Sequence, residues 1–596
     1  MRNQSLNFLK QRINILLIIF SILLLLLIGR FFQLQIIKGP EYKDLREQNI
    51  NASESIYPKR GRILSKDGFV LAEDEKVFSI HVDLEQKPNE ESVALLSSIY
   101  QDALSVDKVQ NSVALSIRTN KPETILDSLT QEELSKFLVR SSELRGFSVQ
   151  ESYTRKYNAH PSIFHVLGHL GFVNDADAEY FSEKIPQYEA NIWNKVGKSG
   201  IERVYEKDLR GEHGKRSFQR NARGTRKQIT NVDDFQEGKE LQTSINFDAQ
   251  KLAFDLLAER QGAVVAIDLN DFSIPVAVSV PSISANDLSG ISSKNYAELL
   301  EDRKRPLFNR AFMGLYPPGS TIKPLLTIFS LSEKYTDWDE TILDDGFFRF
   351  EEEQRVFNAW KEGGHGLTDL EKALVESSNP FFMNLATKFS KEKFVNFLSS
   401  ASFGSILCSD CYPHQYSPLI DDTWKQKNFG KDLYKGDFIN LGVGQGYMLV
   451  TPLHLALITA AIANKGKYKT PYLIEPLQNR DFEIANELTE YDWKKLNDSL
   501  IKVVYSPNGT AFRVNAGSLN MAGKSGTSQV VDISSREEYN LVRENPALRD
   551  HAIFIGYAPY DNPKYAIAVV IENGESGGRV AGPVAKEILE VLVGQD

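Results

Sequence analysis

The hydrophobic positions of this 596-residue chain are distributed very unevenly. The stretch INILLIIFSILLLLLIG, from Ile13 to Gly29, contains no charged residue. As a helix rising about 1.5 Å per residue it would span roughly 26 Å, close to the hydrocarbon thickness of a bilayer. The pattern therefore predicts one membrane-spanning helix over residues 13–33.

The flank of this apolar segment indicates its orientation. Arg2, Lys10 and Arg12 precede it, and no acidic residue lies among the first twelve residues. Positive charge on one side predicts a cytoplasmic tail over 1–12, an anchor in the inner membrane and a periplasmic body. A cleaved signal peptide is the alternative, but it has a shorter apolar core and a small-x-small site, whereas GRFFQLQIIKG follows here. No second apolar run of that length follows, so we expect a single-pass protein.

Residues 34–238 have a mixed pattern that predicts an irregular, extended domain, here called the pedestal. QLQIIKGPEYKDLREQN, which begins at Gln33, predicts a helix leaving the membrane. Apolar residues alternate over 57–83 on both sides of a Lys-Asp-Gly turn, which predicts β-structure. Residues 88–145 are charged and helical in pattern, and glycine-punctuated stretches follow.

The pattern changes near residue 240 and predicts a second domain over 239–596. A strand enters an amphipathic helix over 241–260, and 320–400 is expected to be mostly helical. Two β-hairpins and a closing helix are predicted over 262–280, 551–574 and 582–594. Helices between β segments from both ends favour an α+β domain, in which both ends build one antiparallel sheet flanked by helices.

Composition narrows the classes of function. The chain is 42% hydrophobic and 25% charged, as folded proteins are, and its net charge of −10 argues against a nucleic-acid partner. Two cysteines exclude a disulfide scaffold. Cys408 and Cys411, with His414 nearby, leave a local disulfide and a zinc site as alternatives. His165 and His169 have the i, i+4 spacing of a helical metal site, but no glutamate stands between them as in a zinc protease.

The first candidate for chemistry is GLYPPGSTIKP, residues 314–324. Ser-x-x-Lys alone is a weak signal, because it also occurs in charged helical stretches at Ser105, Ser390 and Ser499. Around Ser320, however, the prolines and the glycine stop any preceding element and let a helix begin at or near the serine. Lys323 would then lie one turn on, within reach of the hydroxyl, and in an apolar pocket it could act as a base near neutral pH.

Two further motifs follow in the same region. ESSNPFF offers Ser377 and Asn379, which a loop can aim in the same direction. AGKSGTSQVV offers Lys524 to Thr527 at the head of a β segment, where Lys524 and Gly526 would face one way and Ser525 and Thr527 the other. Each motif has copies elsewhere that are structural, including Ser-x-Asn at Ser284 and Lys-Ser-Gly at Lys198.

Together and in this order, the three motifs are the signature of penicillin-binding proteins and serine β-lactamases. The chain resembles the class B penicillin-binding proteins from the anchor to the last helix. PKRGRILSKDGFVLA, RKYNAHPSIFHVLGHLGFV and GKSGIERVYEKDLRG are similar to the three pedestal motifs of the class. LGVGQGYMLVTPLHLA, SPNGTA and RDHAIFIGYAPYDNPKYAIAVVIENG look most like the elongation enzymes of rod-shaped bacteria, with the division enzymes as the nearest alternative.

The resemblance implies the penicillin-binding transpeptidase fold on a pedestal (dimerisation-like) domain, and a peptidoglycan D,D-transpeptidase that cross-links stem peptides during cell elongation. Ser320 would attack the carbonyl between the two terminal D-alanines of a stem pentapeptide and form an acyl-enzyme. Lys323 would take the serine proton. Ser377 would relay a proton to the leaving D-alanine, and Asn379 would hold a substrate amide. β-Lactams would acylate the same Ser320.

The third motif would bind the substrate's terminal carboxylate. The resemblance implies that Lys524 supplies positive charge and that the hydroxyls of Ser525 and Thr527 bind the carboxylate. Gly526, without a side chain, would let the ligand approach the backbone. The backbone N–H groups of Ser320 and Thr527 would form the oxyanion hole.

Some of the elongation enzymes carry a zinc site near the active site, built from two aspartates, a histidine and a cysteine. By motif, this chain keeps Asp344 and His365 but has Ala359 and Ser378 at the other two positions. Two ligands do not make a structural zinc site, so we predict no metal there and no cofactor. What holds the loop over 344–366 is then an open question.

The resemblance also implies partners and leaves alternatives. We expect glycan strands to come from a RodA-type SEDS glycosyltransferase, contacted with other elongasome proteins through the anchor and pedestal. The alternatives are a division-specific transpeptidase, a non-enzymatic β-lactam-binding scaffold or sensor, and a hydrolase of the carboxypeptidase or β-lactamase kind. An intact Ser320–Lys323 pair argues against a scaffold, a twelve-residue tail leaves no room for a sensor's effector, and a simple hydrolase needs no pedestal.

Overall fold

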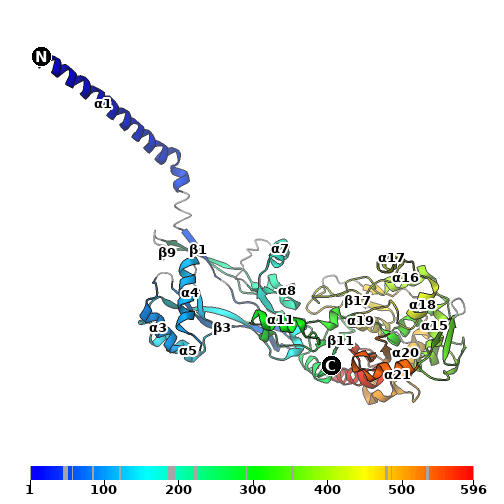
Figure 1. The fold of residues 1–596 in the computed structure, drawn as a ribbon. Helices are drawn as coiled ribbons and strands as arrows, with labels where there is room; N and C mark the ends of the chain where they lie inside the picture. The colour runs from blue at the N-terminus through cyan, green and yellow to red at the C-terminus, as the bar shows by residue number, and fades with distance from the viewer. Residues whose placement is uncertain are drawn as a thin grey trace. The chain divides into compact units, whose positions relative to one another are not determined.

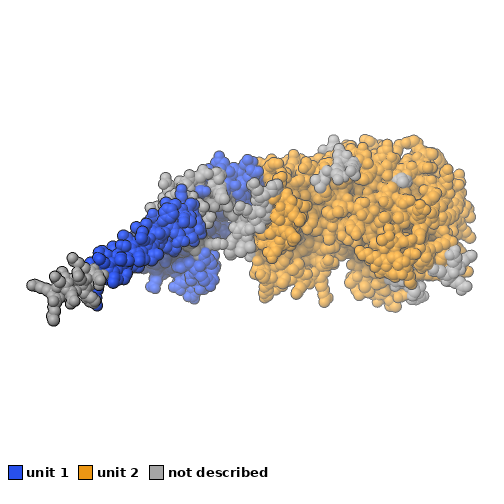
Figure 2. All heavy atoms as spheres, turned by 90° about the horizontal axis from the view of Figure 1, so that it is seen from above, with its two compact units in different colours: residues 1–60, 74–154, 210–238 blue, residues 61–73, 155–209, 239–596 orange. Residues whose placement is uncertain are grey.

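The computed structural model describes residues 2–43, 51–56, 58–83, 86–101, 103–119, 123–185, 195–220, 226–289, 291–350, 355–476, 481–484, 486–531 and 536–594. These residues form two compact units, coloured separately in Figure 2. Unit 1 comprises Met1–Arg60, Asp74–Thr154 and Arg210–Gly238, and unit 2 comprises Gly61–Glu73, Arg155–Leu209 and Lys239–Asp596. Two segments of the predicted pedestal, 61–73 and 155–209, thus belong to the larger unit 2.

The apolar N-terminal segment is helical. Helix α1 spans Arg2–Phe32 and continues into a π-helical turn, η1, over Gln33–Ile37 (Figure 1). Residues 12–37 are long and apolar enough to cross a membrane, and none of their most apolar window is buried. Helical structure resumes over 39–43, as predicted, whereas residues 44–49 of the predicted exit helix lie outside the described residues.

Unit 1 combines a small sheet with a helical layer. Strands β1 (Asn51–Ile56), β8 (Gly214–Arg220) and β9 (Arg226–Asp233) pair antiparallel. The segment predicted to be helical forms α3 (Glu90–Ile99), α4 (Val106–Thr119) and α5 (Gln131–Val139), with the short strand β4 (Thr124–Leu126) between the last two. Asn89 and Thr130 begin α3 and α5 with capping boxes, which satisfy backbone N–H groups that a helix start leaves open.

Strand β3 (Val70–Val82) begins in unit 2 and strand β5 (Phe147–Tyr157) ends in it, within the two pedestal segments that belong to this unit. Buried Arg155 joins the two pedestal segments, 61–73 and 155–209. Its Nε lies 2.7 Å from Glu202 Oε1, and its Nη1 donates to Gly61 O at 2.8 Å. Tyr157 N donates to Asn286 Oδ1 at 3.0 Å, and Asn286 Nδ2 returns a bond to Tyr157 O at 2.8 Å. Arg155 thus ties 155–209 to Gly61, Tyr157 ties 155–209 to Asn286, and backbone bonds from Leu241 N to Arg62 O and from Thr243 N to Leu64 O tie 61–73 to residues beyond 239.

The sheet of unit 2 confirms the predicted assembly from both ends of the domain. The strand order is β12-β11-β21-β20-β19, and each neighbouring pair is antiparallel. The predicted hairpins are β11 (Gly262–Asp268) with β12 (Val276–Val280), and β20 (His551–Ala558) with β21 (Tyr565–Ile571). Strand β19 (Ala522–Ser528) forms one edge.

Helices cover both faces of this sheet (Figure 1), which makes the unit α+β as predicted. Along β11, Ala263, Val265 and Ile267 pack in one core and Val264 and Ala266 in the other. The first core receives α13 (Lys323–Ser332) and α19 (Pro452–Ala463), and the second receives α10 (Phe247–Leu257) and the closing helix α22 (Gly582–Gly594). Nearly every residue of β11 and β21 is therefore apolar, because both faces of the sheet are buried.

The prediction that 320–400 is mostly helical was wrong for its middle. The described residues of this region form the α-helices α13, α14 (Leu370–Val375), α15 (Asn379–Ala386) and α16 (Lys391–Ser400). Between α13 and α14, however, the described residues form the strand pairs β13 (Ile342–Asp344) with β16 (Gly366–Thr368) and β14 (Phe347–Phe350) with β15 (Arg355–Asn358). Gly346 and Gly364 both have positive φ, outside the right-handed helical region, and a Cβ on Gly364 would meet Gly346 N at 2.4 Å.

Further helices and strands complete unit 2. They are β2 (Ile63–Leu64), β10 (Leu241–Gln242), α6 (Phe164–Leu167), β6 (Leu170–Phe172), α7 (Asp175–Lys184), β7 (Lys195–Gly197), α8 (Gly200–Val204), α9 (Glu206–Arg210), α11 (Ser293–Glu301), α12 (Arg310–Met313), α17 (Asp422–Phe429), α18 (Lys435–Leu441), β17 (Lys467–Lys469), β18 (Asp481–Glu483), α20 (Glu490–Tyr505) and α21 (Arg536–Glu544).

Candidate active site

Ser320 lies in a short 3-10 turn, η4 (Gly319–Ile322), that leads directly into α13. Pro324 occupies the first turn of α13, where a missing N–H costs no hydrogen bond. The prediction that the serine stands at a helix start is confirmed, with the α-helix itself beginning at Lys323. Ser320 remains partly accessible, whereas Lys323 is fully buried.

Glycines set how closely the backbones approach this turn. Gly319 has φ +54°, and its N–H donates to Gly444 O at 2.9 Å. A Cβ on Gly319 would meet Thr527 O at 2.6 Å, and one on Gly444 would meet Gly319 O at 2.2 Å. The serine turn is therefore held between the loop that carries Gly444 and the edge strand β19.

Lys323 joins the first two predicted motifs. Its Nζ donates to Asn379 Oδ1 at 2.8 Å and to Ser377 O at 3.0 Å. It also lies 3.2 Å from Ser378 O and 3.4 Å from Ser377 Oγ. An ammonium group has only three donors, so these four acceptors fully occupy it. Among the hydrogen bonds of the described residues, none joins Lys323 to Ser320; catalytic contacts often tighten only when substrate binds.

The surroundings of Lys323 favour its neutral form. Burial lowers its pKa well below the ordinary value, and the positive charge of Lys524 lowers it further. The carboxylate of Asp344 acts in the opposite direction. Burial also lowers the pKa of Lys524, to about 7. Both lysines are fully buried, and Lys524 can change charge near neutral pH.

The second motif forms a strained turn. Ser377 has φ +61°, in the left-handed region that costs a non-glycine residue about 1–3 kcal/mol. Ser378 then caps α15 and accepts a hydrogen bond from Phe381 N at 3.3 Å. Because Asn379 starts α15, the turn brings the Ser377 hydroxyl and the Asn379 amide to the same ammonium group.

The third motif lies on β19, and its side chains alternate as predicted. Lys524 is fully buried, and its Nζ donates to Ser525 O at 3.1 Å. Gly526 was predicted to leave space for a ligand, but its space is used by the protein. A Cβ there would meet Thr321 Cγ2 at 2.8 Å and Pro318 O at 3.0 Å, because the serine turn packs against the strand at this residue.

The hydroxyls of Ser525 and Thr527 contact other segments of the protein. Ser525 Oγ donates to Thr510 Oγ1 at 2.7 Å and is largely buried. Thr527 is exposed, and its Oγ1 lies 3.5 Å from Glu575 O. Gln445 Nε2 lies 3.4 Å from Thr527 O. Ser320, Lys323, Ser377, Asn379 and the β19 backbone therefore come together, while the Ser525 hydroxyl is turned to a neighbouring loop.

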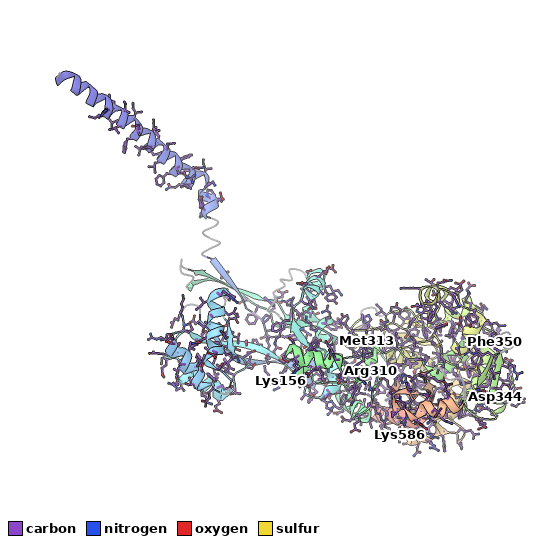
Figure 3. The ribbon with its side chains drawn as sticks, viewed as in Figure 1. Lys156, Arg310, Met313, Asp344, Phe350 and Lys586 are labelled. Atoms are coloured by element: carbon purple, nitrogen blue, oxygen red, sulfur yellow. A yellow bond between two sulfur atoms is a disulfide. The ribbon has the colours of Figure 1, made fainter. Side chains whose placement is uncertain are left out.

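Hydrogen bonds hold the loop over 344–366. Asp344 Oδ2 accepts from Ser378 Oγ at 2.5 Å and from His365 Nδ1 at 2.7 Å, and all three side chains are buried. Burial alone would raise the pKa of Asp344, but hydrogen bonds from Ser378, His365 and Gly346 hold it below the ordinary value. Figure 3 shows Asp344 and Phe350 at the end of unit 2 opposite Lys156. This network links three of the four positions considered for zinc, whereas Ala359 has no ligand atom to offer.

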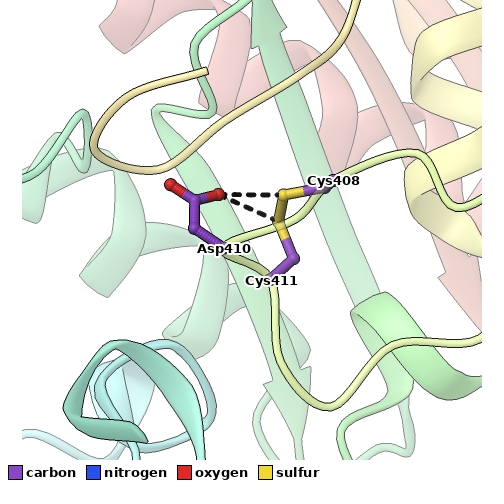
Figure 4. Close-up of side chains that lie close together, drawn as sticks. All are labelled: Cys408, Asp410 and Cys411. Carbon is purple, nitrogen blue, oxygen red and sulfur yellow. Dashed lines mark hydrogen bonds between the residues drawn. A yellow bond between two sulfur atoms is a disulfide. The ribbon is translucent and has the colours of Figure 1, made fainter. Parts of the chain in front are cut away.

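The two cysteines form a disulfide, Cys408–Cys411, which confirms the first of the two alternatives (Figure 4). Buried Asp410 lies between them in sequence, with Oδ1 3.1 Å from Cys408 Sγ. Its carboxylate accepts from Leu473 N at 3.0 Å and Ile474 N at 2.9 Å, while burial raises its pKa. This carboxylate is thus committed to holding the backbone of a neighbouring loop.

The alternative of a metal site on a helix at His165 and His169 is wrong, because the two residues do not lie on one helix. Helix α6 ends at Leu167, and Gly168 with φ +78° turns the chain before His169. Burial lowers the pKa of both histidines to about 4, so both are neutral at physiological pH. Within the described part of the chain, neither belongs to a cluster of metal-ligating side chains.

Sequence reasoning assigned no site role to several residues that shape this site. Thr510 holds the Ser525 hydroxyl, and Trp360 Nε1 donates to Ser377 O at 3.3 Å. Gly319 and Gly444 set the backbone approach. Thr510 and Gly444 stand in the stretches SPNGTA and LGVGQGY, which were noted only for their resemblance. Trp360 lies in no motif, so only the folded structure identifies it.

Comparisons with known families match both parts of the chain. The family described as penicillin binding protein transpeptidase domain matches residues 262–590. The family described as penicillin-binding protein dimerisation domain matches residues 55–243. A Haemophilus influenzae protein named peptidoglycan D,D-transpeptidase MrdA is 32% identical over 584 residues, which cover 96% of this chain and 89% of that protein.

Solved structures are similar over nearly the same length. Penicillin-binding protein 2 (PBP2) of Helicobacter pylori, solved in complex with MreC, has a TM-score of 0.78 and 26% identity, covering 92% of this chain and 99% of that one. PBP2 of Pseudomonas aeruginosa, in complex with WCK 5153, has a TM-score of 0.67 and 28% identity, covering 91% and 96% of the two chains. Similarity therefore extends over both units.

Proposed function

The chain belongs to the class B penicillin-binding proteins, and on that premise we propose that Ser320 is the nucleophile of a peptidoglycan D,D-transpeptidase of the elongation type. The family resemblance inferred from the three motifs is confirmed, as is its elongation branch. The single observation that carries the site assignment is the buried Lys323, whose ammonium group contacts Ser377 and Asn379 within one turn of Ser320.

In the acylation step, Ser320 Oγ attacks the carbonyl carbon between the two terminal D-alanines of a stem pentapeptide. Neutral Lys323 accepts the serine proton, and burial makes this form available near neutral pH. The peptide C–N bond breaks, and the proton passes through Ser377 Oγ, 3.4 Å from Lys323 Nζ, to the departing D-alanine amine. The products are free D-alanine and an ester on Ser320. Asn379 holds a substrate amide and, through its 2.8 Å bond, keeps Lys323 in place.

The third motif binds the terminal carboxylate. Lys524, buried on β19, supplies positive charge, and Thr527 on the same strand is exposed. Ser525 contributes by exchanging its bond to Thr510 for one to the carboxylate. The N–H groups of Ser320 and Thr527 stabilise the developing oxyanion, and losing one such donor costs roughly 3–4 kcal/mol. An amine of a neighbouring stem then attacks the ester, which forms the cross-link and restores the Ser320 hydroxyl.

Labelling with fluorescent penicillin tests the nucleophile. We expect Ser320→Ala to abolish covalent labelling, because β-lactams acylate the same oxygen. Ser390→Ala is the matched control, since Ser390 also begins a Ser-x-x-Lys sequence in unit 2 and its side chain makes no cap hydrogen bond. Labelling of Ser320→Ala at the wild-type rate would show that another residue is the nucleophile.

We propose that helix α1 anchors the protein in the inner membrane, with the N-terminus in the cytoplasm and the two units in the periplasm. The support is the 26-residue apolar span and the positive charges of Arg2, Lys10 and Arg12 before it. A cysteine-accessibility assay tests the orientation: a cysteine at position 5 should resist an impermeant reagent in intact spheroplasts, and one at position 390 should react.

We propose that the protein works with a RodA-type SEDS glycosyltransferase and with an MreC-type scaffold. The H. pylori relative is solved with MreC, which supports the second partner, while the first rests on family resemblance. Affinity purification from crosslinked membranes should recover both. Depletion should produce round cells if the enzyme serves elongation; filaments would instead support a division role.

A further inference from the structure

The left-handed turn at Ser377 depends on contacts from outside its own segment. A non-glycine residue persists at φ +61° only where its surroundings leave it no alternative. Ser377 O accepts one bond from Lys323 Nζ at 3.0 Å and a second from Trp360 Nε1 at 3.3 Å. Ser378 Oγ donates to Asp344 Oδ2 at 2.5 Å. The bonds from Trp360 and to Asp344 lead to the loop over 344–366, not to the motif itself.

The loop is itself built to hold these two contacts. His365 Nδ1 lies 2.7 Å from Asp344 Oδ2, and His365 N donates to Asp344 O at 3.0 Å, which fixes the carboxylate. The Trp360 and His365 ring centroids lie 5.7 Å apart. Gly364 has φ +70°, and a Cβ on it would meet Asp344 O at 2.2 Å, so the loop closes tightly at this residue.

We propose that Asp344, Trp360 and His365 form a clamp that positions the 377–379 turn for acylation. The inference rests on the proposed function, because it concerns the turn that presents Ser377 and Asn379 to Lys323. The clamp residues are positioning residues and need not touch the substrate. Trp360 acts through its hydrogen bond to Ser377 O, and Asp344 acts through its hydrogen bond from Ser378 Oγ. His365 acts by holding the Asp344 carboxylate.

The clamp determines where the proton-relay hydroxyl lies. Without the Trp360 bond, Ser377 O keeps only the Lys323 contact, and without the Asp344 bond, the Ser378 side chain keeps only its cap bond from Phe381 N, while Ser378 O keeps its 3.2 Å contact with Lys323 Nζ. The strained residue can then relax toward negative φ, which moves Ser377 Oγ away from Lys323 Nζ. A displacement near 1 Å of a reacting group costs about 100-fold in rate.

Two variants test the clamp in the full-length, detergent-extracted protein. Trp360→Phe keeps an aromatic ring but removes the N–H, and because the side chain is 58% exposed the change should leave folding intact. Ser378→Ala removes the bond to Asp344. Stopped-flow acylation by a fluorescent penicillin separates the first-order acylation constant from the dissociation constant of the preceding complex. We expect the acylation constant to fall about 10-fold and about 100-fold respectively, with the dissociation constant unchanged.

Trp338→Phe is the matched control, because Trp338 Nε1 also donates one hydrogen bond, to Asp492 Oδ1 at 2.9 Å, and Trp338 is buried. Among the hydrogen bonds of the described residues, none joins its side chain to the 377–379 turn. It should lower the thermal midpoint and leave the acylation constant unchanged. Chelation with EDTA should also leave the wild-type constant unchanged; a loss that zinc restores would mean that a metal holds the loop, and would overturn the proposal.

The outcomes distinguish this proposal from the assignment of the nucleophile. If Ser320→Ala labels normally, the proposed function itself is wrong. If Ser320→Ala shows no labelling but the acylation constant of Trp360→Phe is within twofold of the wild-type value at full amplitude, the clamp proposal is wrong and the proposed function stands. If Ser378→Ala does not fold, the acylation constant of Trp360→Phe alone decides whether the clamp proposal is right.

Discussion

Substituting Gly319 by alanine tests whether backbone approach sets the geometry of the nucleophile. A Cβ on Gly319 would lie 2.6 Å from Thr527 O. A carbon in contact with a carbonyl oxygen needs about 3.3 Å, so the serine turn and strand β19 must separate by about 0.7 Å. A misplacement near 1 Å costs about 100-fold. We therefore expect Gly319→Ala to lower the second-order acylation rate constant by about 10- to 100-fold.

Gly319→Ala also places alanine at φ +54°, which costs about 1–2 kcal/mol of stability. Gly517→Ala separates the two effects, because Gly517 has the same φ of +54° and no heavy atom within 4 Å of its Cβ position. Both variants should lose similar stability to the positive φ, and only Gly319→Ala should slow acylation.

The assay combines fluorescent-penicillin acylation rates with thermal unfolding of the same preparations. The rates must be corrected for the folded fraction, so that lost stability is not counted as lost chemistry. Equal acylation rates for Gly319→Ala and Gly517→Ala would refute the reasoning, because they would show that the contact between the serine turn and β19 does not fix Ser320.

Three further predictions concern charge and stability. The pKa of Lys524 is lowered by burial to about 7, so above that pH the residue loses its charge and the second-order acylation rate constant for an anionic β-lactam should fall; a rate that stays flat from pH 6 to pH 8.5 would contradict this. Burial lowers the pKa of His454 from 6.5 to about 4, so the unfolded chain binds more protons between these values and stability is lost as pH falls through them. The free energy of unfolding should therefore fall by about 2 kcal/mol between pH 7 and pH 5. His454→Gln should remove that part of the pH dependence, as measured by denaturant unfolding. Replacing both Cys408 and Cys411 by alanine opens a short loop and should cost about 2 kcal/mol in unfolding experiments. A change in acylation rate in that variant would show that the disulfide also shapes the site.

Periodicity predicted the sheet of unit 2 well because both of its faces are buried. Strands such as β11 and β21 are nearly continuous apolar runs, and the closing helix α22 ends where the pattern ends. The same reasoning failed over 342–368, where the short strand pairs depend on close approach at glycines and not on a buried face. The membership of 61–73 and 155–209 in unit 2 was also not predictable, because it depends on long-range contacts such as those of Arg155.

The candidate site shows the same limit at the level of single residues. The motifs singled out Ser320, Lys323, Ser377 and Asn379, and the fold brings these residues together, because each motif carries its own helix start or turn. At Gly526 the sequence indicated a close approach, because a glycine in a strand leaves space beside the backbone, but it did not say which groups approach. Here the approaching groups are Thr321 and Pro318 of the serine turn.

Gly319, Gly444 and Gly526 therefore share one function, which no single motif reveals. Each lets the serine turn approach another backbone segment: Gly319 toward Thr527, Gly444 toward Gly319 and Gly526 toward Pro318. The position of Ser320, the proposed nucleophile, is then fixed by main-chain contacts on two sides. The position of Lys323, its proposed base, is fixed by the Ser377 carbonyl oxygen and the Asn379 side chain. It follows that alanine at these glycines should impair catalysis by moving Ser320, whereas loss of the clamp should impair it by moving Ser377. The two classes of variant should therefore combine additively in the logarithm of the acylation constant, unless the serine turn and the 377–379 turn move together.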